Sequence, residues 1–153
     1  MQPEQIIQQF YQAFAEKRAE DMVAHYHDEV VFRDPGFGEL KGEQAKDMWR
    51  MLIERGGASL NVSFSDVHGN GDQGQAKWEA TYVFGPKKRP VHNRIQASFQ
   101  FQDGKIIRHT DQFNMWRWSR QALGLPGLLL GWTPFLQNQV QGRSRSLLKK
   151  YRK

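Results

Sequence analysis

The spacing of apolar residues changes once along this 153-residue chain, at Leu60. Before Leu60 they recur with the helical period of about 3.6 residues, and after it with the strand period of two. Leu60, Val62 and Phe64 alternate with polar residues, and comparable alternation continues to about residue 117. Helices followed by long strands, with no internal repeat, predict a single α+β domain.

Three helices are expected before Leu60. Pro3 suits the first turn of a helix. A shorter helix carries Met22, Val23 and Tyr26, and a third follows Gly42 and ends at Gly56-Gly57. In the first helix, one apolar stripe consists of Ile6, Ile7, Phe10, Tyr11 and Phe14.

One short strand and four long ones complete the predicted domain. The short strand covers Val30 to Arg33 and ends at Asp34-Pro35-Gly36, because proline cannot donate to a sheet ladder. The long strands are expected at 60–65, 76–84, 93–101 and 105–117, with a hairpin turn at Asp103-Gly104. The predicted fold class is α+β: a cone-like half-barrel of a curved mixed or antiparallel sheet, with three N-terminal helices and an apolar C-terminal extension.

The extension combines an apolar segment with a basic end. We place a pocket domain at 1–118 and treat 119–153 as part of the same domain. Leu123 to Leu136 is more apolar than the surface of a monomer usually is. We expect it to form a lid or a homodimer contact; a membrane surface is an alternative that we do not favour. Residues 137–153 are expected to be held loosely, with Lys149 to Lys153 facing solvent and truncation after Arg143 tolerated.

The net charge of +6 is concentrated at the C-terminus. Six of the 22 Lys and Arg residues lie in the last eleven positions, and no acidic residue follows Asp111. Such an end is usually solvated, so a nucleic-acid partner is not favoured. With no cysteine, no signal-like N-terminus and no apolar run of about 20 residues, we expect a cytoplasmic protein. The histidines and acids show no metal-ligand spacing, and no metal or other cofactor is expected.

Two carboxylates lie among large apolar residues: Asp34 at the end of the short strand, and Asp111 in the last strand. A charge among core residues is costly unless it is paired or used. His109 lies two residues before Asp111, so both side chains point to the same face of the strand. We therefore take Asp34, His109 and Asp111 as catalytic candidates that face one cavity.

Each candidate also has a structural interpretation. Asp34 is either a general base whose pKa is raised by burial or a turn residue that accepts backbone N–H groups. His109 and Asp111 form either an acid–base pair that acts on a substrate or a structural pair in which each side chain serves only as the hydrogen-bond partner of the other. Asn93 either orients a substrate carbonyl or makes a strand-edge hydrogen bond. The residues expected to contact a small apolar molecule are Phe10, Tyr11, Phe14, Trp49, Trp78, Tyr82, Asn93 and Phe113.

Two local motifs accompany this order of elements. One is YHDEVVFRDP at 26–35, and the other is FQFQDGKIIRH at 99–109. With them, residues 3–118 resemble the nuclear transport factor 2-like superfamily, and specifically its SnoaL-like and ketosteroid-isomerase-like branch. The resemblance implies a pocket fold that hosts isomerases, cyclases, epoxide hydrolases, dehydratases and non-enzymatic binders. The activity must therefore be argued from the site.

The resemblance to ketosteroid isomerases holds at one position and fails at two. Asp34 falls where those enzymes keep the base that moves a proton between carbons. Their two hydrogen-bond donors to the ketone fall at Phe10 and Ala97. Neither side chain can donate, although the neighbouring Tyr11 carries a hydroxyl.

The resemblance to limonene-epoxide hydrolases is also partial. Asp111 falls at their late-strand acid and Asp34 at their water-holding amide. The arginine-containing pair of their second long strand is missing, because the inward face here carries Trp78, Ala80 and Tyr82.

SnoaL-like character remains: an apolar cavity with few acid–base groups, in which a late-strand aspartate such as Asp111 shuttles a proton. The resulting prediction is a soluble pocket protein that catalyses proton transfer, as an isomerase, cyclase or hydrolase, on a small apolar or polyketide-like molecule. The alternatives are non-catalytic binding of a small ligand and an interaction module built on the C-terminal segment. The sequence leaves open whether the protein is an enzyme or a non-catalytic binding protein.

We expect delta-5-3-ketosteroid isomerase activity to be weak at best. Each missing oxyanion donor lowers the rate by about 10²–10³-fold, and Phe10 and Ala97 remove both donors. A spectrophotometric assay with a standard steroid ketone checks this, and rates near those of true isomerases would identify Tyr11 as the donor.

Overall fold

The structure, a computed structural model, describes residues 1–153. Helices and strands follow in the order α1 Pro3–Ala15, α2 Ala19–Val23, β1 Tyr26–Asp34, β2 Gly38–Lys41, α3 Glu43–Gly56, β3 Asn61–Asn70, β4 Gln73–Phe84, β5 Arg89–Gln102, β6 Lys105–Gln112, α4 Met115–Leu123, α5 Leu125–Leu130 and α6 Pro134–Tyr151. One turn of 3-10 helix, Gly57–Ser59, joins α3 to β3.

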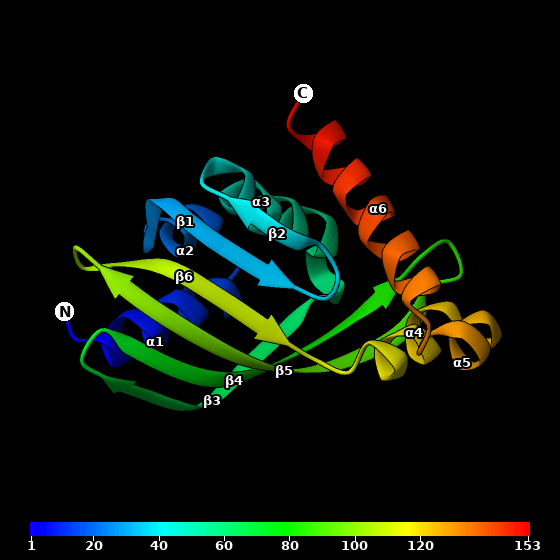
Figure 1. Cartoon of the computed structure of the whole chain (residues 1–153), viewed down its shortest axis with the longest axis horizontal. Helices are drawn as coiled ribbons and strands as arrows, with labels where there is room; N and C mark the ends of the chain where they lie inside the picture. Colours follow the sequence, from blue (N-terminus) through cyan, green and yellow to red (C-terminus); the bar gives the residue numbers. More distant parts are fainter.

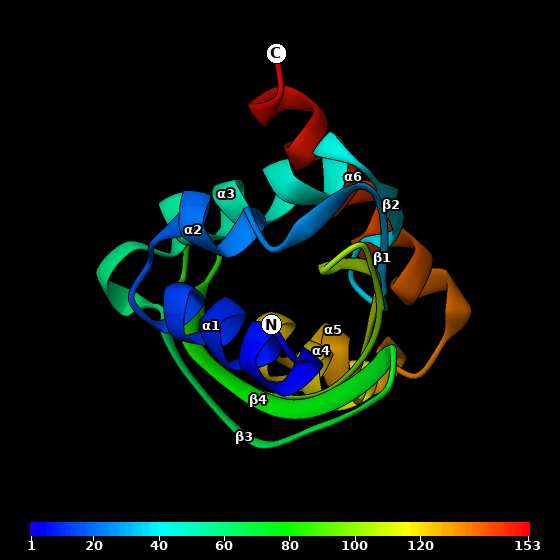
Figure 2. The same cartoon turned by 90° about the vertical axis from the view of Figure 1, so that its left-hand side faces the viewer.

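The six strands form one sheet in the order β2-β1-β6-β5-β4-β3 (Figure 1). All neighbouring strands are antiparallel except β1 and β6, which run parallel. The sheet curves around α1, and α2 and α3 lie across its open side (Figure 2). This arrangement confirms the predicted half-barrel of a curved mixed sheet with three N-terminal helices.

Aromatic side chains fill the space between the helices and the concave face of the sheet. The buried stripe of α1 meets the inward residues of β1 and β6 and the buried face of α3. The largest fully buried side chains are Trp49, Tyr11, Tyr26, Phe10, Phe14 and Phe32. Such a core of large rings determines how closely α1 and α3 approach the sheet.

The N-terminal strands differ from the prediction in two ways. Tyr26, placed on a helix by its spacing from Met22, is the first residue of β1, which is nine residues long rather than four. The segment Gly38–Lys41, expected as part of a turn, forms β2 and pairs with the end of β1. A four-residue edge strand between a Pro-Gly turn and a helix is too short for periodicity to reveal.

The last strand ends earlier than expected. β6 stops at Gln112, and α4 begins at Met115, where the Asn114 side chain accepts a hydrogen bond from the Arg117 N–H at 2.9 Å as an N-cap. Met115, Trp118 and Ala122 are then buried at helical spacing. The prediction that the strand continues to residue 117 was wrong. Apolar and polar residues alternate by chance over residues 113–117, whereas the N-cap at Asn114 starts a helix.

Helices α4 and α5 pack backbone against backbone. A Cβ atom added at Gly127 would lie 1.9 Å from the Ser119 carbonyl oxygen, and one at Gly131 would lie 2.7 Å from the Ser119 Cβ. Only glycine permits this approach. No helix in the structure is long and apolar enough to cross a membrane.

Residues 137–153 are not held loosely, because α6 runs from Pro134 to Tyr151 and packs on α3. Leu148 is buried in the main core, and the Arg145 guanidinium donates to the Phe37 carbonyl at 2.7 Å. The Gln141 amide donates to the Pro35 carbonyl at 3.0 Å. The charged residues at the end of α6 do face solvent. Two buried leucines and three backbone contacts suffice to dock a helix whose composition is mostly polar.

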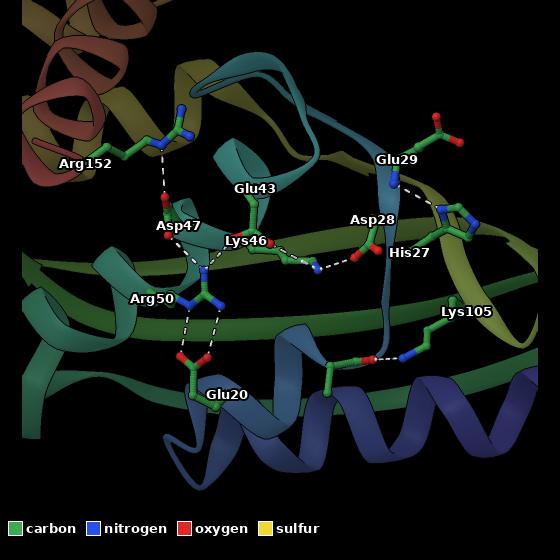
Figure 3. Close-up of polar contacts among 11 residues, drawn as sticks. Glu20, His27, Asp28, Glu29, Glu43, Lys46, Asp47, Arg50, Lys105 and Arg152 are labelled. Carbon is green, nitrogen blue, oxygen red and sulfur yellow. Dashed lines mark hydrogen bonds and ion pairs between the residues drawn. The ribbon is translucent and has the colours of Figure 1, made fainter.

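An ion cluster joins α2, α3 and α6 on the outside of the helical layer (Figure 3). Arg50 makes two hydrogen bonds to Glu20, at 2.9 and 3.0 Å, and one to Asp47 at 2.9 Å. Asp47 also accepts from Arg152 at 2.9 Å, and Lys46 pairs with Asp28 at 3.1 Å. Exposed pairs contribute little individually, and the bidentate pair of Arg50 with Glu20 is the most specific of them, joining α3 to α2.

Leu148→Ala should lower the free energy of unfolding by about 2–4 kcal/mol, because it leaves a cavity in the core. Leu129→Ala is the matched control: Leu129 is 59% exposed, and its truncation should change stability by less than about 0.5 kcal/mol. Urea unfolding followed by circular dichroism measures both. Similar small effects would show that α6 is not docked.

Candidate functional site

A cavity of about 730 Å³ lies between the end of the sheet and helices α3, α4 and α6. Its lining is mostly apolar, with 20 hydrophobic residues among 32, as in sites for small organic molecules. The lining residues that are exposed, among them Arg55, Lys87 and Arg143, mark its opening between α3, the β4–β5 turn and α6. In Figure 1, α6 and the β4–β5 turn lie at the right-hand end of the molecule, and α3 lies over its middle.

The parallel pairing of β1 with β6 brings the two candidate carboxylates together. Phe32 pairs with His109 and Arg33 with Thr110, so the next step of this register places Asp34 beside Asp111. Neighbouring strands lie about 4.8 Å apart. Both aspartates line the cavity.

Asp34 is the titratable group whose environment most favours proton transfer. Burial raises the pKa of its carboxyl from the ordinary 3.8 to about 7. The Phe37 N–H, which donates to Asp34 Oδ1 at 2.6 Å, and the Gly36 N–H oppose this rise, while the Asp111 carboxylate adds to it. Asp34 therefore combines both sequence interpretations: it accepts backbone N–H groups in the turn and also faces the cavity.

Asp111 is held by a buried chain of hydrogen bonds. Its Oδ1 lies 2.8 Å from His109 Nε2 and 3.4 Å from Trp78 Nε1. On the other side of the imidazole, His109 Nδ1 lies 2.7 Å from the Tyr26 hydroxyl, which accepts from Trp49 Nε1 at 2.8 Å. Since the indole donates to Tyr26, the hydroxyl proton is directed to Nδ1 and the Nε2–H to Asp111. Asp111 Oδ2 makes no hydrogen bond within the protein.

Aromatic rings fix the plane of the His109 imidazole. Phe99 stacks on it with ring centroids 4.4 Å apart, and the Trp49 ring lies parallel at 5.9 Å. His109 is completely buried and does not line the cavity. It lies on the expected face of the sheet, behind Asp111, and positions that carboxylate.

Tyr82 supplies a hydroxyl to the same cavity. Trp118 Nε1 donates to the Tyr82 hydroxyl at 2.7 Å, which leaves the phenolic proton free to donate to another group. Burial raises the pKa of Tyr82, the Trp118 hydrogen bond opposes that rise, and the nearby Asp34 adds to it. The phenol therefore remains a proton donor at neutral pH.

The residues expected to contact a small molecule fall into two groups. Phe10 and Tyr11 are fully buried in the core and do not reach the cavity. The Tyr11 hydroxyl has no hydrogen-bond partner. The residues of the expected set that do line the cavity are Phe14, Trp49, Trp78, Tyr82, Asn93 and Phe113.

Two residues of the site were not among the predicted site residues: Tyr26 and Trp118. The position of Tyr26 could not be extrapolated from Val30 and Phe32, because Asp28 has the same parity and is exposed, and the register with β6 shifts between Tyr26 and Val31. Trp118 was assigned to the boundary of the extension, and only the turn into α4 brings its indole to Tyr82. No three His, Asp or Glu side chains are grouped so that they could hold a metal ion.

The half-barrel and its carboxylate-lined apolar cavity define a small-molecule pocket protein of the nuclear transport factor 2-like superfamily. The sequence profile of the SnoaL-like domain matches residues 7–109, and the chain belongs to this family. No curated protein matches the chain significantly.

Solved structures share the fold at low sequence identity. A nuclear transport factor 2-like protein of unknown function from Burkholderia pseudomallei has a TM-score of 0.67 at 14% identity, covering 80% of this chain and 99% of that one. An LEH-like epoxide hydrolase of M. tuberculosis has a TM-score of 0.64 at 18% identity, covering 84% and 97%. A proposed polyketide cyclase from Xanthomonas campestris pv. campestris has a TM-score of 0.61 at 20% identity, covering 76% and 93%.

The raised pKa of Asp34 should make stability depend on pH. Because the folded-state pKa lies above the unfolded one, the folded state holds the extra proton between about pH 4 and 7, and stability falls as the pH rises through this window. Asp34→Asn removes this dependence while keeping an acceptor for Phe37. At about 1.4 kcal/mol per pKa unit, the variant should gain about 2–4 kcal/mol over the wild type at pH 8 and much less at pH 4.

Urea unfolding at a series of pH values measures this difference. The exposed Asp72 provides the matched control, since Asp72→Asn should leave the pH profile unchanged. Parallel profiles for the wild type and Asp34→Asn would contradict a raised pKa at Asp34.

Proposed function

We propose that the chain is an enzyme that transfers a proton on a small, apolar, polyketide-like molecule. The observation that carries the proposal is a pair of neighbouring carboxylates in an apolar cavity, one with a pKa of about 7. A general base works best when its pKa is near the working pH. A carboxyl needed only for the turn could remain in water.

In the proposed step, the Asp34 carboxylate takes a proton from a carbon next to a carbonyl group. The C–H bond breaks, and its electron pair moves onto the carbonyl oxygen to give an enolate. The Tyr82 hydroxyl donates a hydrogen bond to that oxygen, a role that Phe10 and Ala97 cannot fill. The protonated Asp34 then returns the proton to a second, conjugated carbon while the ketone re-forms. Alternatively, the enolate carbon attacks a carbonyl carbon elsewhere in the substrate to close a ring, the π electrons of that carbonyl move to its oxygen, and the resulting alkoxide takes the proton from Asp34.

Asp111 is proposed as the second acid–base group. Oδ2 has no protein partner, so it can exchange a proton with substrate in the cavity. The imidazole behind it, with Tyr26 at the far nitrogen, stabilises one orientation of this carboxylate. His109 is accordingly a positioning residue.

The cavity and the structural relatives support the same class of substrate. Trp49, Trp78 and Phe113 line the cavity, and their ring faces suit a flat molecule. The Xanthomonas relative is a proposed polyketide cyclase, and the M. tuberculosis relative an epoxide hydrolase. A homodimer remains a prediction for this chain.

A non-catalytic ligand-binding protein is the second candidate. It is favoured by the His109 imidazole, whose two ring nitrogens both have partners within the protein, and by the Phe37 N–H that occupies one oxygen of Asp34. A binder needs the cavity but not a titrating carboxylate.

Ring opening of 5-nitrobenzisoxazole separates the two candidates, because this flat apolar probe reacts when one base removes one proton. The wild type should catalyse the reaction with a rate that rises through about pH 7. Asp34→Asn should lose at least about 100-fold, and Asp72→Asn should lose nothing.

Quenching of tryptophan fluorescence by the same probe measures binding independently. A wild type that binds the probe but is no faster than buffer would favour the non-catalytic binder. Equal activity in both proteins, well above that of buffer, would place the base elsewhere.

A further inference from the structure

The apolar surface around α5 has no cover in the structure. Nine large hydrophobic residues of the chain are exposed, and all but Met1 and Val83 lie within 116–135. Scattered exposed leucines need no explanation, whereas one contiguous group marks a contact surface. We call this surface the α5 face; its members are Trp116, Leu125, Leu128, Leu129, Leu130, Trp132 and Phe135.

The last carbonyl groups of α5 accept hydrogen bonds from within the protein and do not depend on water. A helix of six residues normally leaves its last carbonyls to water. Here the Trp116 indole donates to the Leu128 carbonyl, and the Trp132 indole to the Leu129 carbonyl, each at 3.0 Å. The Leu130 carbonyl accepts from the Thr133 N–H at 2.9 Å. The leucines can therefore leave water without exposing unsatisfied carbonyl groups to hydrocarbon.

The charge around the α5 face has a single sign. Residues 112–136 contain Arg117 and Arg120 and no acid, and the β4–β5 turn supplies Lys87, Lys88 and Arg89, of which Arg89 donates to the Gln121 carbonyl of α4 at 2.9 Å. The Lys and Arg residues at the end of α6 lie away from α5 (Figure 1). Arg117 and Arg120 are exposed on α4, where the Arg120 guanidinium lies 4.2 Å from the centre of the Trp116 ring. A second copy of the chain would bring a second set of cations to the same contact.

We propose that the α5 face docks on an anionic phospholipid membrane surface. Leucines, two indoles and a phenylalanine enter the boundary between headgroups and acyl chains, and the surrounding Lys and Arg residues attract the anionic headgroups. Helix α4 connects the cavity with the docked surface, since it lines the cavity up to Leu123 and α5 follows directly after Gly124.

Flotation of the full-length protein with vesicles tests the proposal. Vesicles of phosphatidylcholine with phosphatidylglycerol should bind the protein, and vesicles of phosphatidylcholine alone should bind it much less. The double variant Leu128→Gln with Leu129→Gln should bind at least about tenfold more weakly. Both side chains are exposed, so the fold should be unaffected.

A charge-matched pair of variants tests the electrostatic part. Arg117→Gln with Arg120→Gln should weaken binding about fivefold per residue, and added salt should weaken the wild type in the same direction. Lys77→Gln with Arg94→Gln removes the same charge from exposed sites in the middle of β4 and β5 and should bind as the wild type does. Asp34→Asn should also bind normally, which separates this proposal from the proposed catalysis.

Three results would overturn the proposal. One is an absence of binding to both kinds of vesicle at low salt. Another is equal binding to both, which would rule out an anionic surface. The last is a dimer in light scattering that Leu128→Gln with Leu129→Gln converts to a monomer, because that would assign the α5 face to a second copy.

Discussion

The candidate site depends on the parallel pairing of β1 with β6. This is the one parallel contact in the sheet, and it joins strands that are far apart in the sequence. The register shifts between Tyr26 and Val31, and from Val31 to Arg33 the two strands run in step, so residues of equal parity stay level there. Asp34 and Asp111 are brought together by this register, and a shift of one residue would turn one of them to the outer face.

The surroundings of the two carboxylates give them different chemistry. Asp34 has two backbone N–H groups and loses most of its water, so its pKa rises to about 7. Asp111 is held by an imidazole that cannot turn between its aromatic neighbours. In the proposed reaction, Asp34 carries the proton and Asp111 is a second group held in one orientation. Such a division of roles between carboxylates is how one site combines acid and base chemistry.

Much of the fold could be read from the sequence, because long periodic segments report their own type. The stripe from Ile6 to Phe14 and the alternation of β3, β4 and β5 predicted the correct elements. Short elements could not be read, since β2 has four residues and the end of β6 depends on a cap at Asn114.

For the site, sequence parity placed Asp34 and Asp111 on the inward face of the sheet. Parity does not show whether an inward side chain reaches the cavity or lies behind its wall. His109 and Tyr11 have the right parity or stripe and yet lie behind the cavity wall. Depth depends on the size of neighbouring rings and on the angle at which α1 crosses the sheet, and neither is encoded locally. The chain from Trp49 to Tyr26 to His109 joins three separate elements, which no spacing rule connects.

The close approach of α4 and α5 has a consequence for how the extension meets its surroundings. An ordinary amphipathic helix turns its large apolar residues inward and its polar residues outward. In α5 the order is reversed, because Gly127 meets the Ser119 backbone where no side chain fits. The leucines point outward because no side chain fits between α5 and the backbone of α4 at this contact. The orientation of the exposed leucines therefore depends on a residue that has no side chain of its own.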